Sequence, residues 1–443
     1  IYCLPSCKAR KAKTENARFF HTCEAAREAG LRACKKCHPD DYALGADPVL
    51  ETIETLVAEI RANPADFADA RAIVRRSGFG STRAFELFRE HYHTTPADML
   101  LRARLDLAKE KLLQSNAPVS EIAFAAGFEG LSGFHDNFLK LNGLTPAAYR
   151  VLKSRSSFVI KLPEGYLLSY LRRALSRDAH SVSESLIADT YTAAVRFKSG
   201  IAELTLKLSP TNIGVRVSTA GGVEAHAMVI GLLGLEQDAA AFARLAKKLG
   251  LGRLVAGRPG LRVSQTHSVF DGLLWAIIGQ QINFPFACLL KRRLFELVGE
   301  KLPNGLYAAP RPEAVAALTP DQLTAVQFSR QKAAYVIDTA RLVSHGKLDL
   351  DKLAGLSATR AERTLLAVRG LGPWSVNYLM MRALGFADCV PYGDTGVTSG
   401  LQALLKLETR PDVDATRRLM AVFSPWRSLA TAHLWQLNQP EPS

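Results

Sequence analysis

The spacing of apolar residues changes twice along this chain of 443 residues, and that change limits the folds open to it. From about residue 48 to 152 apolar side chains recur at helical spacing. Between about 158 and 235 they alternate with polar ones, as in AELTLKLS and NIGVRVST, which is typical of a half-buried antiparallel sheet. From about 236 onward the helical spacing returns, with breaks at Gly and Pro. The sequence predicts a multidomain, mainly α-helical protein with one α+β domain.

The charge of the chain indicates a polyanionic partner. Its 56 Lys and Arg residues outnumber 42 Asp and Glu residues, which gives a formal net charge of +14. A basic excess of this size concentrates phosphates around a protein, so nucleic acid is the leading candidate. The sequence has no run of about 18 apolar residues that could cross a bilayer. We therefore expect no membrane partner and a cytoplasmic protein of the bacterial nucleoid.

Four cysteines near the start of the chain have the spacing of a zinc site. Cys3 and Cys7 form a C-x3-C pair and Cys34 and Cys37 a C-x2-C pair, so four thiolates can meet at one tetrahedral metal. A zinc that only folds a small domain is the ordinary interpretation of such a set. The basic residues between Cys3 and Cys37 suit a phosphate backbone, and they are Lys8, Arg10, Lys11, Lys13, Arg18, Arg27, Arg32, Lys35 and Lys36.

The stretches YCLPSCKAR and RACKKCHPDD resemble the zinc domain of Ada-type DNA methylation-damage proteins, which repair methyl phosphotriesters. The resemblance implies that Cys3 is the zinc-bound thiolate that accepts the methyl group. Zinc keeps such a sulfur deprotonated and nucleophilic at neutral pH. Leu4 stands where the family usually has arginine, and the chain opens at Ile1 without the strands that the family has before the first cysteine. We expect an N-terminally shortened Ada-like zinc domain over residues 1–45.

The helical block 48–152 contains two helix-turn-helix patterns. In the second, VSEIAFAAGFEGLSGFHDNFLKLNGLTPAAYR, a turn at Gly127 precedes a helix whose outward residues are predicted to contact DNA: Ser132, His135, Asn137 and Lys140. This block resembles AraC-type transcriptional regulators. The first pattern departs from them, with Ala84 and Glu86 where leucine and arginine are favoured. The alternative is a helical domain that binds only protein. For residues 157–235 we find no catalytic constellation and expect a packing domain.

The segment LLAVRGLGPWSVNYLMMRAL predicts a helix, a hairpin and a second helix, with Gly370 and Gly372 in the turn. Glycine adopts positive φ freely, and the amide hydrogens of a helix N-terminus can bind a phosphate of any base sequence. A plain turn between helices is the alternative. Asp394 follows Trp374 by twenty residues, after a loop broken by Pro and Gly. That spacing could bring a carboxylate back beside the hairpin.

This combination resembles the helix-hairpin-helix DNA glycosylases of the AlkA type, which excise 3-methyladenine. RPGLR, AIIGQQ and PWRSLATAHLW also match, so the resemblance covers about residues 157–438, with an AlkA N-terminal-like α+β domain at 157–235 and an all-α glycosylase domain at 236–443. It implies that Asp394 is the catalytic carboxylate. It also implies three base-pocket residues, Trp374, Tyr378 and Trp435, and a wedge at Gln281, where the family has leucine.

The residue types suit excision of a charged base. N3-methyladenine already carries positive charge, so an anion such as Asp394 is the group the reaction needs to stabilise the oxocarbenium-like sugar. Electron-rich aromatic faces favour a cationic base. Relatives that also cut the backbone carry a lysine where this chain has Trp374, so we predict a monofunctional enzyme. Beyond residue 37 the sequence has only Cys288 and Cys389, which excludes the four-cysteine iron–sulfur cluster of some relatives.

We therefore predict a DNA alkylation repair and response protein of four domains. It would be a DNA-3-methyladenine glycosylase of type II, fused to a zinc sensor and a transcriptional regulator, with methyl transfer to Cys3 as an accessory reaction. The expected cofactor is one Zn²⁺. The expected partners are double-stranded DNA, at damaged sites and promoters, and RNA polymerase, and the chain is expected to be a monomer. The alternative is an alkylation-responsive transcription factor whose glycosylase-like domain is catalytically silent.

Overall fold

The computed structural model describes residues 1–4, 7, 9, 12–35, 37, 39–43, 47–437 and 439. The predicted boundary at residue 45 and the predicted ends at 438 and 443 lie outside the described residues, as do Lys8, Arg10, Lys11 and Lys36 among the basic residues between Cys3 and Cys37. The N-terminal part contains short helices, which are η1 (Thr14–Asn16), α1 (Cys23–Glu28) and α2 (Pro39–Ala43). A single bridge between Tyr2 and Ala33 brings the two cysteine pairs toward each other.

The second part is a bundle with two helix-turn-helix units. The units are α4–α5 and α7–α8, and the long helix α6 joins them. Gly127 makes the turn of the second unit at φ +89°, where a Cβ would lie 2.9 Å from the Cα of Ala65. The elements are α3 (Pro48–Ala62), η2 (Pro64–Asp66), α4 (Ala70–Arg76), α5 (Ser81–Tyr92), α6 (Pro96–Gln114), α7 (Val119–Ala125), α8 (Leu131–Asn142), α9 (Pro146–Arg150) and η3 (Val151–Ser154).

The third part holds a five-stranded antiparallel sheet in the order β1-β5-β4-β3-β2. The AELTLKLS stretch lies in β4, where Leu204 and Leu206 are buried and Thr205 and Lys207 are more exposed. The predicted alternation is thus confirmed. The elements are β1 (Ser157–Lys161), α10 (Leu168–Leu175), β2 (Glu184–Ile187), β3 (Thr190–Phe197), β4 (Gly200–Leu208), β5 (Asn212–Val217) and α11 (Gly222–Leu233).

The remaining part is helical and encloses the largest apolar core of the described residues. The prediction of an all-α domain did not include a two-stranded ribbon, β6 (Glu300–Lys301) and β7 (Tyr307–Ala308). The helices are α12 (Ala239–Lys248), η4 (Gly252–Leu254), α13 (Val269–Ile278), α14 (Phe284–Val298), α15 (Pro312–Ala316), α16 (Pro320–Ala325), α17 (Arg330–Ser344), α18 (Leu350–Leu353), α19 (Ala358–Leu366), α20 (Pro373–Arg382), α21 (Thr395–Leu405), α22 (Val413–Met420), η5 (Ala421–Phe423) and α23 (Arg427–Leu437).

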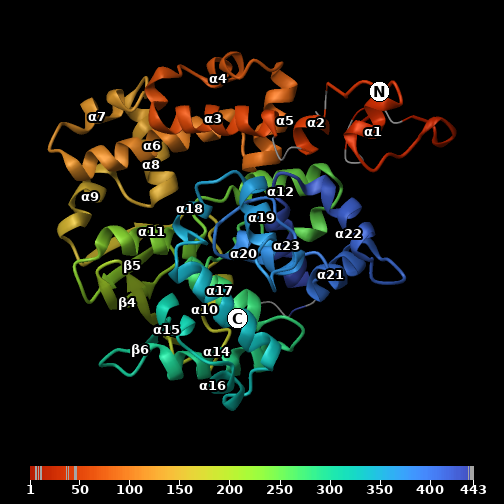
Figure 1. The fold of residues 1–443 in the computed structure, drawn as a ribbon. Helices are drawn as coiled ribbons and strands as arrows, with labels where there is room; N and C mark the ends of the chain where they lie inside the picture. The colour runs from red at the N-terminus through yellow and green to blue at the C-terminus, as the bar shows by residue number, and fades with distance from the viewer. Residues whose placement is uncertain are drawn as a thin grey trace.

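The helix-turn-helix bundle lies along one side of the molecule, against both the sheet part and the last part (Figure 1). Helix α5 of the first unit contacts α19, the first helix of the predicted hairpin, and His91 Nδ1 lies 2.8 Å from Thr359 Oγ1. On the other side, His226 of α11 contacts the carbonyl oxygen of Asn142 at the end of α8. None of the helices in the described residues combines the length and apolar character that crossing a membrane requires.

Candidate active site

The predicted hairpin joins α19 to α20 as the sequence indicated. Gly370 has φ +92°, and a Cβ there would lie 2.5 Å from Cγ of Tyr335, so both its conformation and its surroundings require glycine. Gly372 is the N-cap residue of α20, and Pro373 begins the helix. Gly372 is exposed and no side chain caps this end, so the Gly372 amide can reach an outside ligand, whereas Pro373 has no amide hydrogen.

Asp394 lies beside this hairpin as the N-cap residue of α21. Its Oδ1 accepts hydrogen bonds from the Val397 amide at 3.0 Å and from Trp435 Nε1 at 2.9 Å. Its Oδ2 accepts one from Trp374 Nε1 at 3.2 Å. A Cβ on Gly396 would lie 2.6 Å from Cδ1 of Trp435, so glycine there leaves room for the indole. The carboxylate is therefore fixed by three donors from three elements.

The three aromatic residues predicted for the base pocket come together next to this carboxylate. Trp374 and Tyr378 are one helical turn apart on α20 and stack, with ring centroids 5.3 Å apart and planes at 21°. Tyr378 meets Trp435 of α23 at 6.2 Å and 43°. The structure thus unites the four residues that the sequence indicated, although they span residues 374 to 435.

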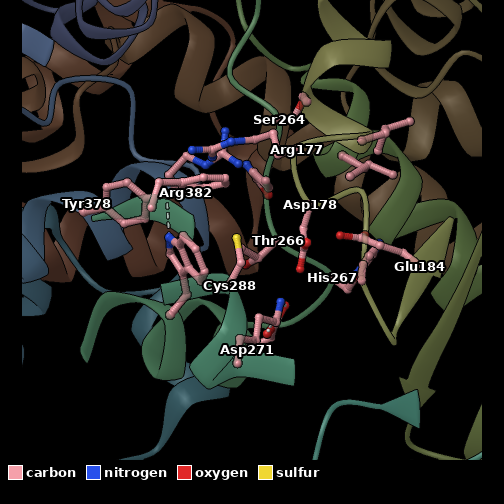
Figure 2. Close-up of a pocket in the computed structure, with 18 residues that line it drawn as sticks. Arg177, Asp178, Glu184, Ser264, Thr266, His267, Asp271, Cys288, Tyr378 and Arg382 are labelled. Atoms are coloured by element: carbon pink, nitrogen blue, oxygen red, sulfur yellow. Dashed lines mark hydrogen bonds and ion pairs between the residues drawn. The ribbon is translucent and has the colours of Figure 1, made fainter. Parts of the chain in front are cut away.

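A cavity of about 110 Å³ opens beyond the hydroxyl of Tyr378, between the sheet part and the helical part (Figure 2). Trp275 Nε1 donates a hydrogen bond to that hydroxyl at 3.0 Å. Arg177 and Arg382 lie beside the Tyr378 side chain in Figure 2. Burial alone would raise the pKa of Tyr378, but the two guanidinium groups outweigh it and lower this pKa. The cavity therefore presents positive charge to one edge of the aromatic group.

Ion pairs balance the charge on the far wall of this cavity. Arg292 Nη1 lies 2.7 Å from Asp178 Oδ1, and Lys291 Nζ lies 2.9 Å from Asp271 Oδ1. The pairs belong to the α10–β2 connection, to α13 and to α14, so this wall is built across the domain boundary. It can offer both donors and acceptors to a polar edge of a ligand.

Gln281 is placed on the turn between α13 and α14. It is exposed and has φ +56°, a left-handed conformation that non-glycine residues rarely adopt. A Cβ on Gly279, two residues earlier, would lie 3.9 Å from Cη2 of Trp374. The turn that carries the predicted wedge is therefore a neighbour of the aromatic group.

The four predicted zinc ligands also come together. The Sγ atoms of Cys3, Cys7, Cys34 and Cys37 all lie within 4.8 Å of one another, a spacing that suits tetrahedral thiolate coordination. Cys7 and Cys34 are buried, whereas Cys3 is exposed and open to a reaction partner. Cys23 lies outside the cluster, and its thiol donates to the carbonyl oxygen of Pro39.

The predicted DNA-contacting face of α8 is only partly free. Ser132, His135 and Lys140 are exposed, opposite the buried Phe134 and Phe138. Asn137 is half-buried, and its side-chain amide donates to the Gly133 carbonyl oxygen at 2.7 Å. Asn137 and Lys140 also line a groove of about 630 Å³ between the bundle, the sheet part and the last part. These two residues therefore face the other domains as well as solvent.

Comparisons with known proteins agree with this arrangement. Three family models match: the metal binding domain of Ada over residues 1–40, a helix-turn-helix domain over 73–151, and the HhH-GPD superfamily of base excision DNA repair proteins over 274–425. A DNA-3-methyladenine glycosylase of Bacillus subtilis is 34% identical over 207 residues, covering 46% of this chain and 68% of that protein. The chain belongs to the DNA-3-methyladenine glycosylase family.

This glycosylase is fused to an Ada-type zinc-binding domain and a helix-turn-helix domain, so the chain joins a repair enzyme to a regulator. A probable bifunctional transcriptional activator/DNA repair enzyme AlkA of Mycobacterium tuberculosis is 27% identical over 464 residues, covering 98% of this chain and 90% of that protein. The solved 3-methyladenine DNA-glycosylase of Archaeoglobus fulgidus shares the fold, with a TM-score of 0.55 and 21% identity, over 63% of this chain and 97% of that chain.

Two residues contribute to the site of this glycosylase without a sequence pattern that indicates their roles. Trp275 carries no motif, yet its indole holds the Tyr378 hydroxyl. Gly396 is the second residue after Asp394. It permits the close approach of Trp435, and no sequence pattern indicates this role. The signal for the capping role of Asp394 was present, because aspartate favours the residue before a helix.

Proposed function

We propose that this chain hydrolyses the N-glycosidic bond of alkylated purines such as N3-methyladenine in double-stranded DNA and leaves the backbone intact. The observation that carries the proposal is the Asp394 carboxylate, which accepts hydrogen bonds from the indoles of Trp374 and Trp435, the two rings that flank Tyr378. A carboxylate fixed in advance stabilises positive charge without reorganising during the reaction.

The reaction needs few groups because the substrate is already activated. The bond between the sugar C1′ and the base nitrogen breaks, and the cationic base leaves as a neutral molecule. Asp394 stabilises the oxocarbenium-like sugar, and water adds to C1′ while its proton passes to the carboxylate or to solvent. Trp374 occupies the place of the lysine that forms an imine in backbone-cutting relatives, so the proposed reaction stops at the abasic site.

The same surface would hold the DNA. The exposed amides at Gly372 and the turn at Gly370 suit a phosphate, since a helix N-terminus favours an anion. Gln281, on the neighbouring turn, would fill the space that the extruded base leaves in the stack. Stacking on Tyr378, Trp374 and Trp435 would favour a cationic base by about 0.5–2 kcal/mol for each ring.

We further propose that Cys3 accepts a methyl group from a DNA phosphotriester. A bond forms between Sγ and the methyl carbon, the bond from that carbon to the phosphate oxygen breaks, and a phosphodiester anion leaves. The exposure of Cys3 in an otherwise half-buried or buried cluster supports this role. Bound zinc would keep the sulfur a thiolate. The methylated form would then act through the helix-turn-helix bundle on promoter DNA and RNA polymerase, as a monomer at the nucleoid.

Base release from DNA that contains N3-methyladenine tests the main proposal. We expect wild type to release free base and Asp394→Asn to lose about 10²–10³-fold in rate while it still binds DNA. Asparagine also caps helices well, so the start of α21 should persist. Release that survives this substitution would exclude the mechanism, and no release from wild type would favour a regulator with a silent glycosylase domain.

A further inference from the structure

A set of hydrogen bonds joins the turn that carries Gln281 to the hairpin that carries Gly370. We propose that Lys332 and Gln280 are positioning residues, which hold Gln281 in place as the wedge and connect it to the phosphate-binding hairpin, so that backbone binding and base extrusion are coupled. The inference rests on the proposed function, because it concerns how the same site takes a base out of the duplex.

Lys332 binds the backbone of the turn that precedes Gln281. It lies in the first turn of α17 and is 9% exposed. Its Nζ donates to the carbonyl oxygens of Ile277 at 3.4 Å and Gln280 at 2.9 Å, and also to that of Ile278. The carbonyls of Ile277 and Ile278 end α13, where a cation is favourable, and that of Gln280 lies in the turn just beyond the helix. One buried ammonium thus fixes the three backbone groups that lead to Gln281.

Burying the Lys332 ammonium is unfavourable, which indicates that this lysine does more than stabilise the end of α13. Burial lowers the pKa of Lys332 to about 8, because its ammonium has lost water. Directly after the fixed carbonyls, Gln281 adopts φ +56° with an exposed side chain. A non-glycine residue stays in this region only where its surroundings hold it there. The carbonyl contacts of Lys332 supply that constraint and direct Gln281 outward.

Gln280 carries the connection to the hairpin. Its Nε2 donates to the carbonyl oxygen of Gly370 at 2.7 Å and to Oγ of Ser375 at 2.8 Å. Ser375 in turn donates to the carbonyl oxygen of Ala276, at 3.3 Å. One side chain therefore touches the turn that would bind phosphate and the helix that carries Trp374, and the next residue in the chain is Gln281.

These contacts predict that phosphate binding and insertion of the wedge occur together. A phosphate seated on the amide of the exposed Gly372, two residues after Gly370, would stabilise the hairpin in the position that Gln280 contacts. Because Gln280 and Gln281 are consecutive and their backbone is fixed by Lys332, the wedge is presented to the stack in the same step. Loss of either positioning residue should leave backbone binding intact and slow the extrusion of the base.

The experiment compares Lys332→Met with Lys347→Met, a matched change at an exposed lysine just beyond α17. Duplexes carry 2-aminopurine beside N3-methyladenine, so that base extrusion is read as a fluorescence rise, separately from DNA binding by anisotropy and from single-turnover base release. For Lys332→Met we expect binding within about twofold of wild type, and losses of about tenfold in extrusion and in release. Lys347→Met should match wild type.

A second duplex, with the lesion opposite an abasic site, presents a base that is already unstacked. Release by Lys332→Met should recover toward wild type on it, because extrusion is then no longer limiting. An equal loss on both duplexes, or wild-type extrusion by the variant, would overturn the inference. If Lys332→Met does not fold, Gln280→Met tests the same link from the hairpin side. Extrusion without base release by wild type would instead contradict the proposed function and leave this inference standing.

Discussion

Trp435 donates its indole N–H to Oδ1 of Asp394 at 2.9 Å, although 41 residues separate them. The contact depends on Gly396, since any side chain there would meet the indole. It also leaves the ring of Trp435 beside Tyr378. One residue thus both orients the carboxylate and supplies a face of the aromatic group. In the proposed reaction it would contribute both to recognition of the base and to stabilisation of the sugar cation.

We predict that Trp435→Phe separates these two roles. Phenylalanine keeps an aromatic face but removes the donor to Asp394. A hydrogen bond to a charged group is worth about 1.5–3 kcal/mol, so the single-turnover rate of base release should fall at least about tenfold, with DNA affinity unchanged. Trp426→Phe is the control, because Trp426 packs against the same helical core as Trp435 but is not among the described donors to the Asp394 carboxylate. Equal rates for wild type and Trp435→Phe would show that the bond does not orient the carboxylate.

Part of this site could be predicted from local patterns in the sequence, whereas the roles of Asp394 and Trp435 were implied by the family resemblance. The hairpin glycines, the alternation of β4 and the cysteine spacing each report a backbone requirement that acts within a few residues. Tyr378 followed Trp374 by one helical turn, so both were expected on one face. These predictions needed no knowledge of how distant segments pack.

The contacts between domains could not be predicted, and the reason is physical. Glu54 and Arg360 form an ion pair across 306 residues, yet in the sequence each resembles any charge on a solvated helix face. The ribbon β6–β7 has two residues in each strand, too few to show an alternation. The partial enclosure of Asn137 likewise depends on domains that a helical pattern does not place.

The zinc site gives a prediction with an internal control. Replacing Cys37 removes one of four thiolates within 4.8 Å of one another, and a site of three ligands binds structural zinc weakly. We expect about one zinc per chain in wild type, a clear loss in Cys37→Ser, and no loss in Cys23→Ser, because the Cys23 thiol contacts the Pro39 carbonyl instead. Metal content after gel filtration measures this. Equal zinc in both variants would contradict the four-cysteine assignment.

The ion pair between Glu54 of α3 and Arg360 of α19 should hold the bundle on the hairpin. Glu54 also accepts a hydrogen bond from Ser357 at 2.7 Å. Glu54→Arg should destabilise the chain to urea, and Glu54→Arg with Arg360→Glu should restore about 1 kcal/mol, a modest value because the Arg360 side chain is 44% exposed. The same exchange at Glu59 and Arg76, a pair within the bundle, is the control for docking. If proteolysis between the domains is as slow in Glu54→Arg as in wild type, the ion pair does not hold the bundle on the hairpin.

His226 makes the contact between the sheet part and α8 sensitive to acid. It is 3% exposed, its Nε2 lies 2.8 Å from the carbonyl oxygen of Asn142, and burial lowers its pKa from 6.5 to about 4. Between these values the unfolded chain binds the proton and the folded chain does not. Its contribution, about 3 kcal/mol, is therefore present above pH 6.5 and is lost as the pH falls toward 4.

Urea unfolding of His226→Gln should show a flatter pH dependence than wild type over this range, because glutamine keeps a donor and cannot titrate. His345→Gln, at an exposed histidine, should keep the wild-type slope. An unchanged slope in His226→Gln would mean that folding does not lower the pKa of this histidine.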